Sequence, residues 1–175
     1  TNEEETIRFA GEIHKSAKRL LTLINDTIRL SQLDTSEQKV IYEAIDLYKI
    51  AEDCVNMLKF SAENHGITIS IHGTNAYLEG NKEMLEEVVY NLCDNAIRYN
   101  NEGGKVDVTV KPVKGKIYLC VEDNGIGISK EHQERIFERF YRVDKSRSKS
   151  TGGTGLGLAI VKHIIQQHGA HMELT

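Results

Sequence analysis

Apolar residues at the start of the chain follow a helical period. From about Asn2 to Leu33 the sequence contains no proline, and apolar residues recur every three or four positions. The stripe consists of Ile13, Ala17, Leu20, Leu21, Ile24 and Ile28. Such spacing predicts one long amphipathic helix. Because this helix has little within itself to bury the stripe against, we expect the stripe to face another helix, such as one from a second chain. Docking on the chain's own domain is the alternative.

A polar break at Asp34, Thr35 and Ser36 ends this segment, and strand and helix periods then alternate. Period-two patterns and short apolar runs predict strands near 40–45, 67–72, 77–79, 106–110 and 116–122. Three- and four-residue spacing predicts helices over about 47–64, 82–99 and 156–168, the second of them capped by Asn81. Residues 125–153 are expected to be mostly loop with a short helical stretch. This order predicts an α+β fold with helices on one face of a mixed sheet.

The composition is that of an ordinary soluble domain. The chain is 39% hydrophobic and 27% charged, and 22 basic against 26 acidic residues give a net charge of −4. Mild acidity argues against a non-specific nucleic-acid binder. Cys54, Cys93 and Cys120 are too few and too scattered for a disulfide framework or a zinc site, which favours a reduced, cytoplasmic setting. No apolar run approaches the ~20 residues of a membrane helix. The sequence begins at Thr1 and stops at Thr175 in a strand-like segment. We therefore expect the chain to be a piece of a longer protein.

One polar motif lies on the helix predicted over 82–99. Glu87, Asn91 and Asn95 follow each other at four-residue steps, so they project from one face. Side-chain oxygens in such a row suit a hard cation, and magnesium takes few protein oxygens together with waters and substrate phosphates. Arg98 lies near the same edge, where it could meet a phosphate. The alternative is an exposed polar face without a ligand.

Two glycine clusters follow. Asp123-Asn124-Gly125-Ile126-Gly127 comes directly after an apolar strand, where a carboxylate could accept a hydrogen bond from an exocyclic amine such as that of adenine. A simple turn is the alternative. The second cluster, residues 152–157, leads into the last helix, whose N-terminus attracts anions. It is not a P-loop, because no Gly-Lys-Ser/Thr follows, and its spacing does not fit a dinucleotide fingerprint.

A basic segment separates these clusters. Residues 139–149 hold five basic residues against one acidic residue, Asp144. The basic residues are Arg139, Arg142, Lys145, Arg147 and Lys149. A solvated loop is one interpretation of such a segment, and a cationic cover over a phosphate site is the other.

Together, these motifs resemble the catalytic ATP-binding domain of sensor histidine kinases, within the Bergerat-fold superfamily that includes gyrase, heat-shock chaperone and mismatch-repair ATPases. The asparagine, first glycine, phenylalanine and second glycine boxes of that family are similar to residues 87–99, 123–127, 136–142 and 153–157. The resemblance implies a two-layer sandwich, in which three helices cover a mixed sheet, over residues 35–175, without its final strand. Residues 1–34 are similar to the second helix of the dimerisation and phosphotransfer hairpin. The central boxes are most similar to membrane-anchored sensors of the phosphate-regulon type.

The resemblance also implies roles for individual residues. Asn95 is expected to bind Mg²⁺, Asn91 to assist at the phosphates, and Asp123 to read the adenine amino group. Arg98 is expected at a phosphate and Tyr99 along the nucleotide. The further residues expected around ATP are the lid arginines Arg142 and Arg147 and the loop residues Gly125, Gly127, Gly153, Thr154, Gly155, Leu156 and Gly157.

The position of Asn91 separates transfer from hydrolysis. Hydrolysing relatives carry a glutamate one turn before the magnesium asparagine, and an asparagine there is no useful base. The resemblance therefore implies transfer of the γ-phosphoryl group to a histidine, with Glu87 able to polarise the imidazole. The implied partners are a response regulator, the phosphoacceptor helix and, in the full-length protein, a second copy. An ATP-hydrolysing Bergerat ATPase and a nucleotide-dependent dimerisation module are the alternatives.

The chain departs from the family at the acceptor. The family's phosphoacceptor histidine is followed by an acidic residue and then a proline, whereas His14 is followed by Lys15. We therefore expect a catalytic fragment, the cytoplasmic portion of a membrane-anchored sensor, that does not phosphorylate itself without a separate acceptor.

Overall fold

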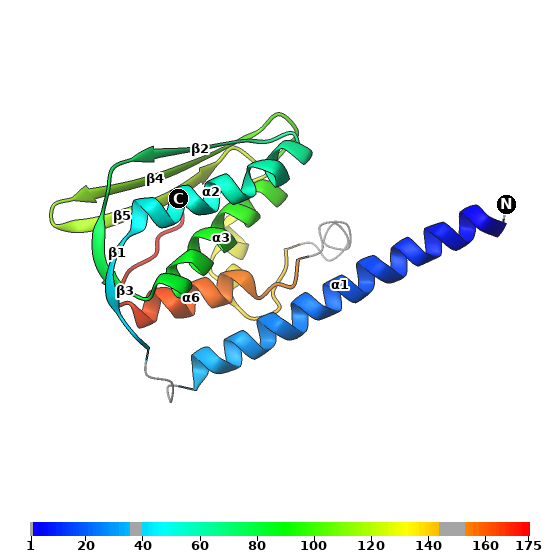
Figure 1. Cartoon of the computed structure of the whole chain (residues 1–175), viewed down its shortest axis with the longest axis horizontal. Helices are drawn as coiled ribbons and strands as arrows, with labels where there is room; N and C mark the ends of the chain where they lie inside the picture. Colours follow the sequence, from blue (N-terminus) through cyan, green and yellow to red (C-terminus); the bar gives the residue numbers. More distant parts are fainter. Residues whose placement is uncertain (1, 36–39, 144–152) are drawn as a thin grey trace.

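A long helix precedes all the other elements of the chain. The structure, a computed structural model, describes residues 2–35, 40–143 and 153–175. Its first element is helix α1 (Asn2–Asp34) (Figure 1). In chain order, the described elements that follow are β1 (Glu43–Asp46), α2 (Leu47–Asn64), β2 (Thr68–Gly73), β3 (Tyr77–Gly80), α3 (Lys82–Arg98), β4 (Lys105–Val113), β5 (Lys116–Asp123), α4 (Lys130–Gln133), the 3₁₀ helix η1 (Arg135–Phe137) and α6 (Gly157–Gln167).

The strands form two sheets in the described part of the chain. Strands β2, β4 and β5 form a mixed sheet in which β2 is parallel and β5 antiparallel to β4, and Val108 faces Ile71 on one side and Val121 on the other. Strands β1 and β3 form a separate antiparallel pair. The predicted mixed sheet is confirmed, and the two short strands stand apart from it.

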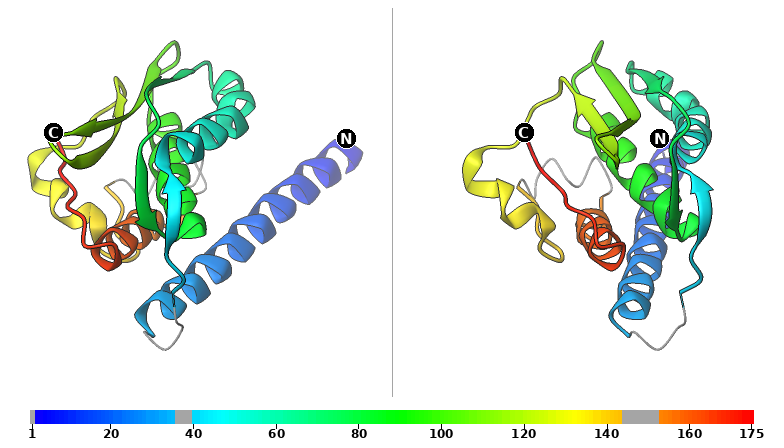
Figure 2. Two further views of the ribbon diagram at one scale, coloured as in Figure 1. Left: turned by 60° about the vertical axis from the view of Figure 1, so that its left-hand side comes forward. Right: turned by 90° about the vertical axis from the view of Figure 1, so that its left-hand side faces the viewer.

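Among the described helices, α2, α3 and α6 form a layer on one face of the mixed sheet. Helices α2 and α3 pack against the sheet and against each other, and α6 packs against α3 (Figures 1 and 2). On β4, Val106, Val108 and Val110 point into this layer and are fully buried, whereas the intervening Asp107 and Thr109 are only half-buried. The α+β sandwich predicted from the sequence is therefore confirmed.

Among the described residues, the buried apolar contacts of helix α1 lie near its C-terminal end. Leu30 and Leu33 are buried together with Met84 of α3 and Ile160 of α6. Toward the N-terminus the helix extends away from the sandwich (Figure 2). The predicted stripe is exposed there: Ile13 is 69% and Leu20 57% accessible. Docking on the chain's own domain thus applies to the last turns, and most of the stripe has no partner within the described residues.

The local signals read from the sequence match the helix ends closely. Asn81 caps α3 by accepting a hydrogen bond from the Met84 backbone N–H at 3.0 Å, as predicted. The strand-like pattern at the end of the chain is misleading, because residues 170–175 form no strand. A strand forms only where a neighbouring strand takes up its backbone hydrogen bonds, which the local pattern does not report. Among the described helices, none is both long and apolar enough to cross a membrane.

Candidate functional site

The polar face of α3 meets the start of α6. The Asn91 side-chain amide donates to the Glu87 carbonyl at 2.9 Å, which fixes its orientation on the helix. A Cβ atom on Gly157 would lie only 2.7 Å from Asn91 Oδ1. Glycine at 157 therefore lets the N-terminus of α6 approach the asparagine face. Two motifs that are 66 residues apart in the numbering of the chain, at Asn91 and Gly157, thus form one site.

The second glycine loop is held in place by the phenylalanine-box segment. Gly155 has a φ of +76°, a left-handed conformation that favours glycine. Its carbonyl accepts a hydrogen bond from Phe140 N–H at 2.9 Å. Thr154 Oγ1 accepts one from Leu156 N–H at 3.3 Å, and Leu156 is fully buried at the start of α6. The loop thus presents the N-terminus of α6 in a defined position.

The first glycine loop crosses the C-terminal end of α3. Asp123, exposed at the end of β5, accepts a hydrogen bond from Gly125 N–H at 2.9 Å. Ile126 N–H donates to the Tyr99 carbonyl at 3.2 Å. A Cβ atom on Gly125 would lie 2.5 Å from the same carbonyl oxygen. The first glycine loop is therefore anchored on the C-cap of α3, and Asp123 is left accessible beside it.

Two arginines lie around this site. Arg98 Nε is 2.6 Å from Asp94 Oδ2, one turn earlier on α3. Burial lowers the pKa of Arg142, a nearby Arg19 lowers it further, and a hydrogen bond with Tyr99 opposes the shift. A Cβ atom on Gly153 would lie 3.5 Å from the Tyr99 hydroxyl and 3.9 Å from Arg142 Nη2, so these three residues meet. Arg147 lies outside the described residues.

Helix α1 supplies neighbours of the site that sequence reasoning missed. Arg29 forms an ion pair with Glu87 at 2.8 Å, and Asp26 accepts a hydrogen bond from the Thr154 hydroxyl at 2.6 Å. These partners are 58 and 128 residues apart in sequence. No local sequence pattern predicts these two contacts, because each depends on where α1 docks.

The donor set of the site fits a hard cation and a phosphorylated ligand. Amide oxygens on α3 suit such a cation, and a helix N-terminus suits anionic oxygens. The described residues contain no group of three His, Cys, Asp or Glu side chains that could hold a metal by themselves. A cation here would need further ligands from water or from the bound molecule, which is the usual manner of magnesium.

Comparisons with known proteins agree with this arrangement. The model of the histidine kinase-, DNA gyrase B- and HSP90-like ATPase family matches residues 80–175. The sensor-like histidine kinase SenX3 of Mycolicibacterium smegmatis is 39% identical over 175 residues, which cover 99% of this chain and 46% of SenX3. The chain thus spans less than half the length of this curated relative.

Solved structures show the same fold. The mycobacterial sensor histidine kinase MprB superimposes with a TM-score of 0.65 at 28% identity, over 74% of this chain and 81% of that chain. Full-length ShkA in complex with AMPPNP gives a TM-score of 0.78 at 24% identity, over 94% of this chain and 34% of that chain. The resemblance found in the sequence is therefore confirmed, and the chain belongs to the histidine kinase-, DNA gyrase B- and HSP90-like ATPase family, as a catalytic ATP-binding domain of the sensor histidine kinase type.

Proposed function

We propose that this chain binds Mg²⁺–ATP and transfers the γ-phosphoryl group to a histidine on a dimerisation helix. The observation that carries the proposal is the approach of α6 to the asparagine face of α3, where Gly157 leaves room for Asn91. That junction combines amide oxygens for a cation with a helix N-terminus for phosphates. In this proposal Asn95 holds Mg²⁺, and Asn91 assists at the phosphates.

The remaining candidate residues divide between the two ends of the nucleotide. Asp123 accepts a hydrogen bond from the adenine amine, and Gly125 and Gly127 let the backbone lie close to the base. The residues proposed to contact the rest of the nucleotide are Arg98, Tyr99, Arg142, Arg147, Gly153, Thr154, Gly155, Leu156 and Gly157. Support for Asp123 comes from its exposure at the end of β5, beside a glycine loop that is anchored on the C-cap of α3.

Transfer, rather than hydrolysis, follows from the residue at position 91. An asparagine amide cannot accept a proton from water at neutral pH, so Asn91 supplies no general base. The γ-phosphoryl group of bound ATP is then not hydrolysed before an imidazole reaches it. In this proposal Glu87, which pairs with Arg29 in the structure, polarises that imidazole once the ion pair opens. The chemistry otherwise rests on positioning and on neutralisation of phosphate charge by Mg²⁺ and the arginines.

We infer the partners from the same proposal. In this proposal the acceptor histidine belongs to a helix outside residues 1–175, since none of the seven histidines is followed by the expected acidic residue. The phosphoryl group then passes to a response regulator in two-component signalling. The exposed apolar stripe on α1 supports pairing with a second helix, as in a homodimer of a longer, membrane-anchored sensor. The same stripe supports the alternative function, a nucleotide-dependent dimerisation module.

Nucleotide binding is tested by replacing the proposed magnesium ligand. We expect Asn95→Ala to weaken Mg²⁺–ATP binding at least tenfold in calorimetric titrations, because a ligand of the metal is lost. Asn56→Ala, which removes an exposed asparagine from the interior of α2, is the matched control and is expected to leave the affinity unchanged. Equal affinities for the Asn95 variant and the unaltered chain would refute the assignment of the metal site.

Phosphoryl transfer is tested with a separate acceptor. The chain is mixed with γ-labelled ATP and a helical hairpin that carries the acceptor histidine. We expect acid-labile label on the hairpin and little release of free phosphate without it. Steady phosphate release in the absence of any acceptor would instead favour the hydrolytic ATPase.

A further inference from the structure

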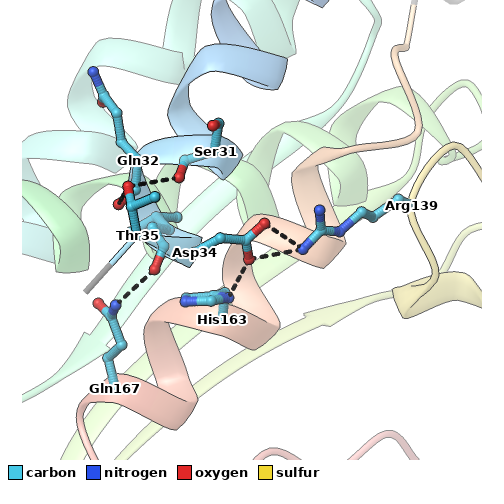
Figure 3. A network of polar contacts seen from close by, with 8 residues as sticks. Ser31, Gln32, Asp34, Thr35, Arg139, His163 and Gln167 are labelled. Atoms are coloured by element: carbon cyan, nitrogen blue, oxygen red, sulfur yellow. Dashed lines mark hydrogen bonds and ion pairs between the residues drawn. The ribbon is translucent and has the colours of Figure 1, made fainter. Parts of the chain in front are cut away.

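The C-terminal half of α1 carries three charged residues that reach three different parts of the candidate site. Asp26 contacts Thr154 in the second glycine loop, and Arg29 contacts Glu87 on α3. Asp34 receives two hydrogen bonds from Arg139, both at 2.8 Å (Figure 3). One face of α1 therefore lies against the second glycine loop, the polar face of α3 and the phenylalanine-box segment.

Further contacts around Asp34 fix the position of this face. His163 of α6 lies 3.6 Å from the Asp34 carboxylate, and Gln167 donates to the Leu33 carbonyl at 3.2 Å (Figure 3). The side chains of Leu30 and Leu33 are buried beside α6. Apolar and polar contacts together dock the last turns of α1, and this docking sets where Asp26 can reach.

Asp26 differs from the other two charged residues in what it meets. Arg29 and Asp34 face side chains of opposite charge, whereas the Asp26 carboxylate accepts a hydrogen bond from the neutral Thr154 hydroxyl at 2.6 Å. The same hydroxyl oxygen accepts a hydrogen bond from Leu156 N–H, at the first turn of α6. The Thr154 side chain thus links the Asp26 carboxylate to the N-terminus of α6, a helix end that attracts anions.

We propose that Asp26 competes with the nucleotide's phosphates, so that docking of α1 lowers the affinity of the site for Mg²⁺–ATP. This inference rests on the proposed function. The Thr154 hydroxyl has a single proton, which it can donate to Asp26 or to a phosphate oxygen but not to both. The fixed negative charge also repels a polyanion at the same helix end. Because coupling is reciprocal, bound nucleotide weakens the docking of α1 to the same extent.

The test is a substitution that keeps the shape of residue 26 and removes its charge. The amide oxygen of Asp26→Asn accepts from Thr154 more weakly than the carboxylate does, because the hydrogen bond is no longer charge-assisted. We expect this substitution to tighten Mg²⁺–ATP binding roughly fivefold, at the low end of coupling between linked sites. Affinity for adenosine, which has no phosphate, should stay unchanged. Glu12→Gln removes one carboxylate charge from an exposed position on α1 and is the matched control. It should alter neither affinity.

The outcomes separate this inference from the proposed function. If the unaltered chain binds Mg²⁺–ATP and Asp26→Asn binds it equally or more weakly, the competition is refuted while the proposed function stands. A gain of the same size for adenosine also refutes it, because the effect would then not involve phosphates. If the unaltered chain binds no Mg²⁺–ATP, both fail together.

A second measurement reports the reciprocal effect without any substitution. Hydrogen exchange of the backbone amides in residues 23–34 is compared with and without saturating Mg²⁺–ATP. We expect faster exchange in the bound state, because phosphate takes over the Thr154 hydroxyl and releases Asp26. Slower or unchanged exchange in a chain that demonstrably binds nucleotide would overturn the opposition between docking and binding.

Discussion

Gly125 shows how closely single atoms constrain the candidate site. Its backbone passes the end of α3 so tightly that an added Cβ atom would lie 2.5 Å from the Tyr99 carbonyl oxygen and 2.9 Å from the Asn100 Cα atom. Both of these are backbone atoms, which cannot move aside as the end of a flexible side chain can. The first glycine loop is therefore positioned by contact with α3, and the absence of a side chain at 125 is a condition of that contact.

We expect Gly125→Ala to lower the free energy of unfolding by about 1–3 kcal/mol, the usual cost of overpacking. Urea titration followed by circular dichroism measures the change. Gly11→Ala is the control, since a Cβ atom there meets nothing within 4 Å and lies inside the exposed α1 helix. It should leave stability unchanged or raise it slightly, as alanine favours helix over glycine. Equal stability of both variants would mean that the loop does not rest on α3.

At the level of elements, the start of α2 depends on one carboxylate. Asp46 caps the helix by accepting a hydrogen bond from Tyr48 N–H at 3.1 Å, and it also accepts from Ala76 N–H at 2.9 Å. Burial acts to raise the pKa of Asp46, but these hydrogen bonds and one from Asn75 outweigh it, so the pKa is lowered overall. The ionised carboxylate thus ties α2 to the chain segment just before β3.

Asp46→Ala should therefore cost about 1–2 kcal/mol of stability at pH 7, the usual range for a lost N-cap. A lowered folded-state pKa stabilises the fold above the unfolded value of about 4, and that contribution disappears as the pH falls through the folded pKa. The stability difference from the unaltered chain should shrink at pH 2–3. Urea unfolding at both pH values measures it, with Glu63→Ala near the other end of α2 as control. A difference that does not depend on pH would contradict a role for the charge.

The apolar stripe on α1 makes a second prediction for an element. Ile13 and Leu20 are mostly exposed, and full burial of side chains of this size contributes about 1.5–3 kcal/mol each. If the stripe pairs with a second copy, Ile13→Glu combined with Leu20→Glu should weaken self-association more than tenfold. Sedimentation at several concentrations gives the association constant. Lys15→Glu with Lys18→Glu, which adds acidic residues elsewhere on the helix, should weaken it far less. Identical masses for all three chains would speak against pairing through the stripe.

In the part of the chain that the structure describes, two apolar clusters share α3. One cluster joins α2, α3 and the sheets, and the other joins α3, α6 and the end of α1. The second cluster connects α1 to the candidate site, because burial of Leu30 and Leu33 fixes the position of this helix. Asp26 and Arg29 lie on the same part of α1 and contact the site. Loss of packing there should loosen α1 without dismantling the first cluster.

Leu33→Ala tests this division. Removing a leucine that is 3% exposed should destabilise the docked end of α1 by about 2–4 kcal/mol, through lost transfer energy and the cavity left behind. Hydrogen exchange should accelerate in residues 23–34 and stay slow in β4. Leu20→Ala, at a position that is 57% exposed, should change exchange very little. Uniform acceleration across β4 as well would show that α1 and the sandwich unfold as one unit.

Much of the fold could be read from local patterns. The helix predicted over 47–64 forms over those residues, and the one predicted over 82–99 ends one residue earlier. Apolar spacing and capping act between neighbours on one helix, so a single sequence reveals them. The separation of β1 and β3 from the mixed sheet was not predicted, because strand partners are chosen by tertiary packing. Each motif of the candidate site lies within a short stretch of sequence and could be found in the same way, whereas the roles of its residues were predicted from the resemblance to a known family.

The sequence by itself determined which residues form α1, α2 and α3, which glycines interrupt them, and which asparagines share a face. Those features depend on residues at most a few positions apart. Only the tertiary structure decided that Gly157 meets Asn91, that Arg29 pairs with Glu87, and that Asp26 reaches Thr154. These contacts join segments that are 58 to 128 residues apart, and their partners are fixed only when apolar burial brings α1, α3 and α6 together.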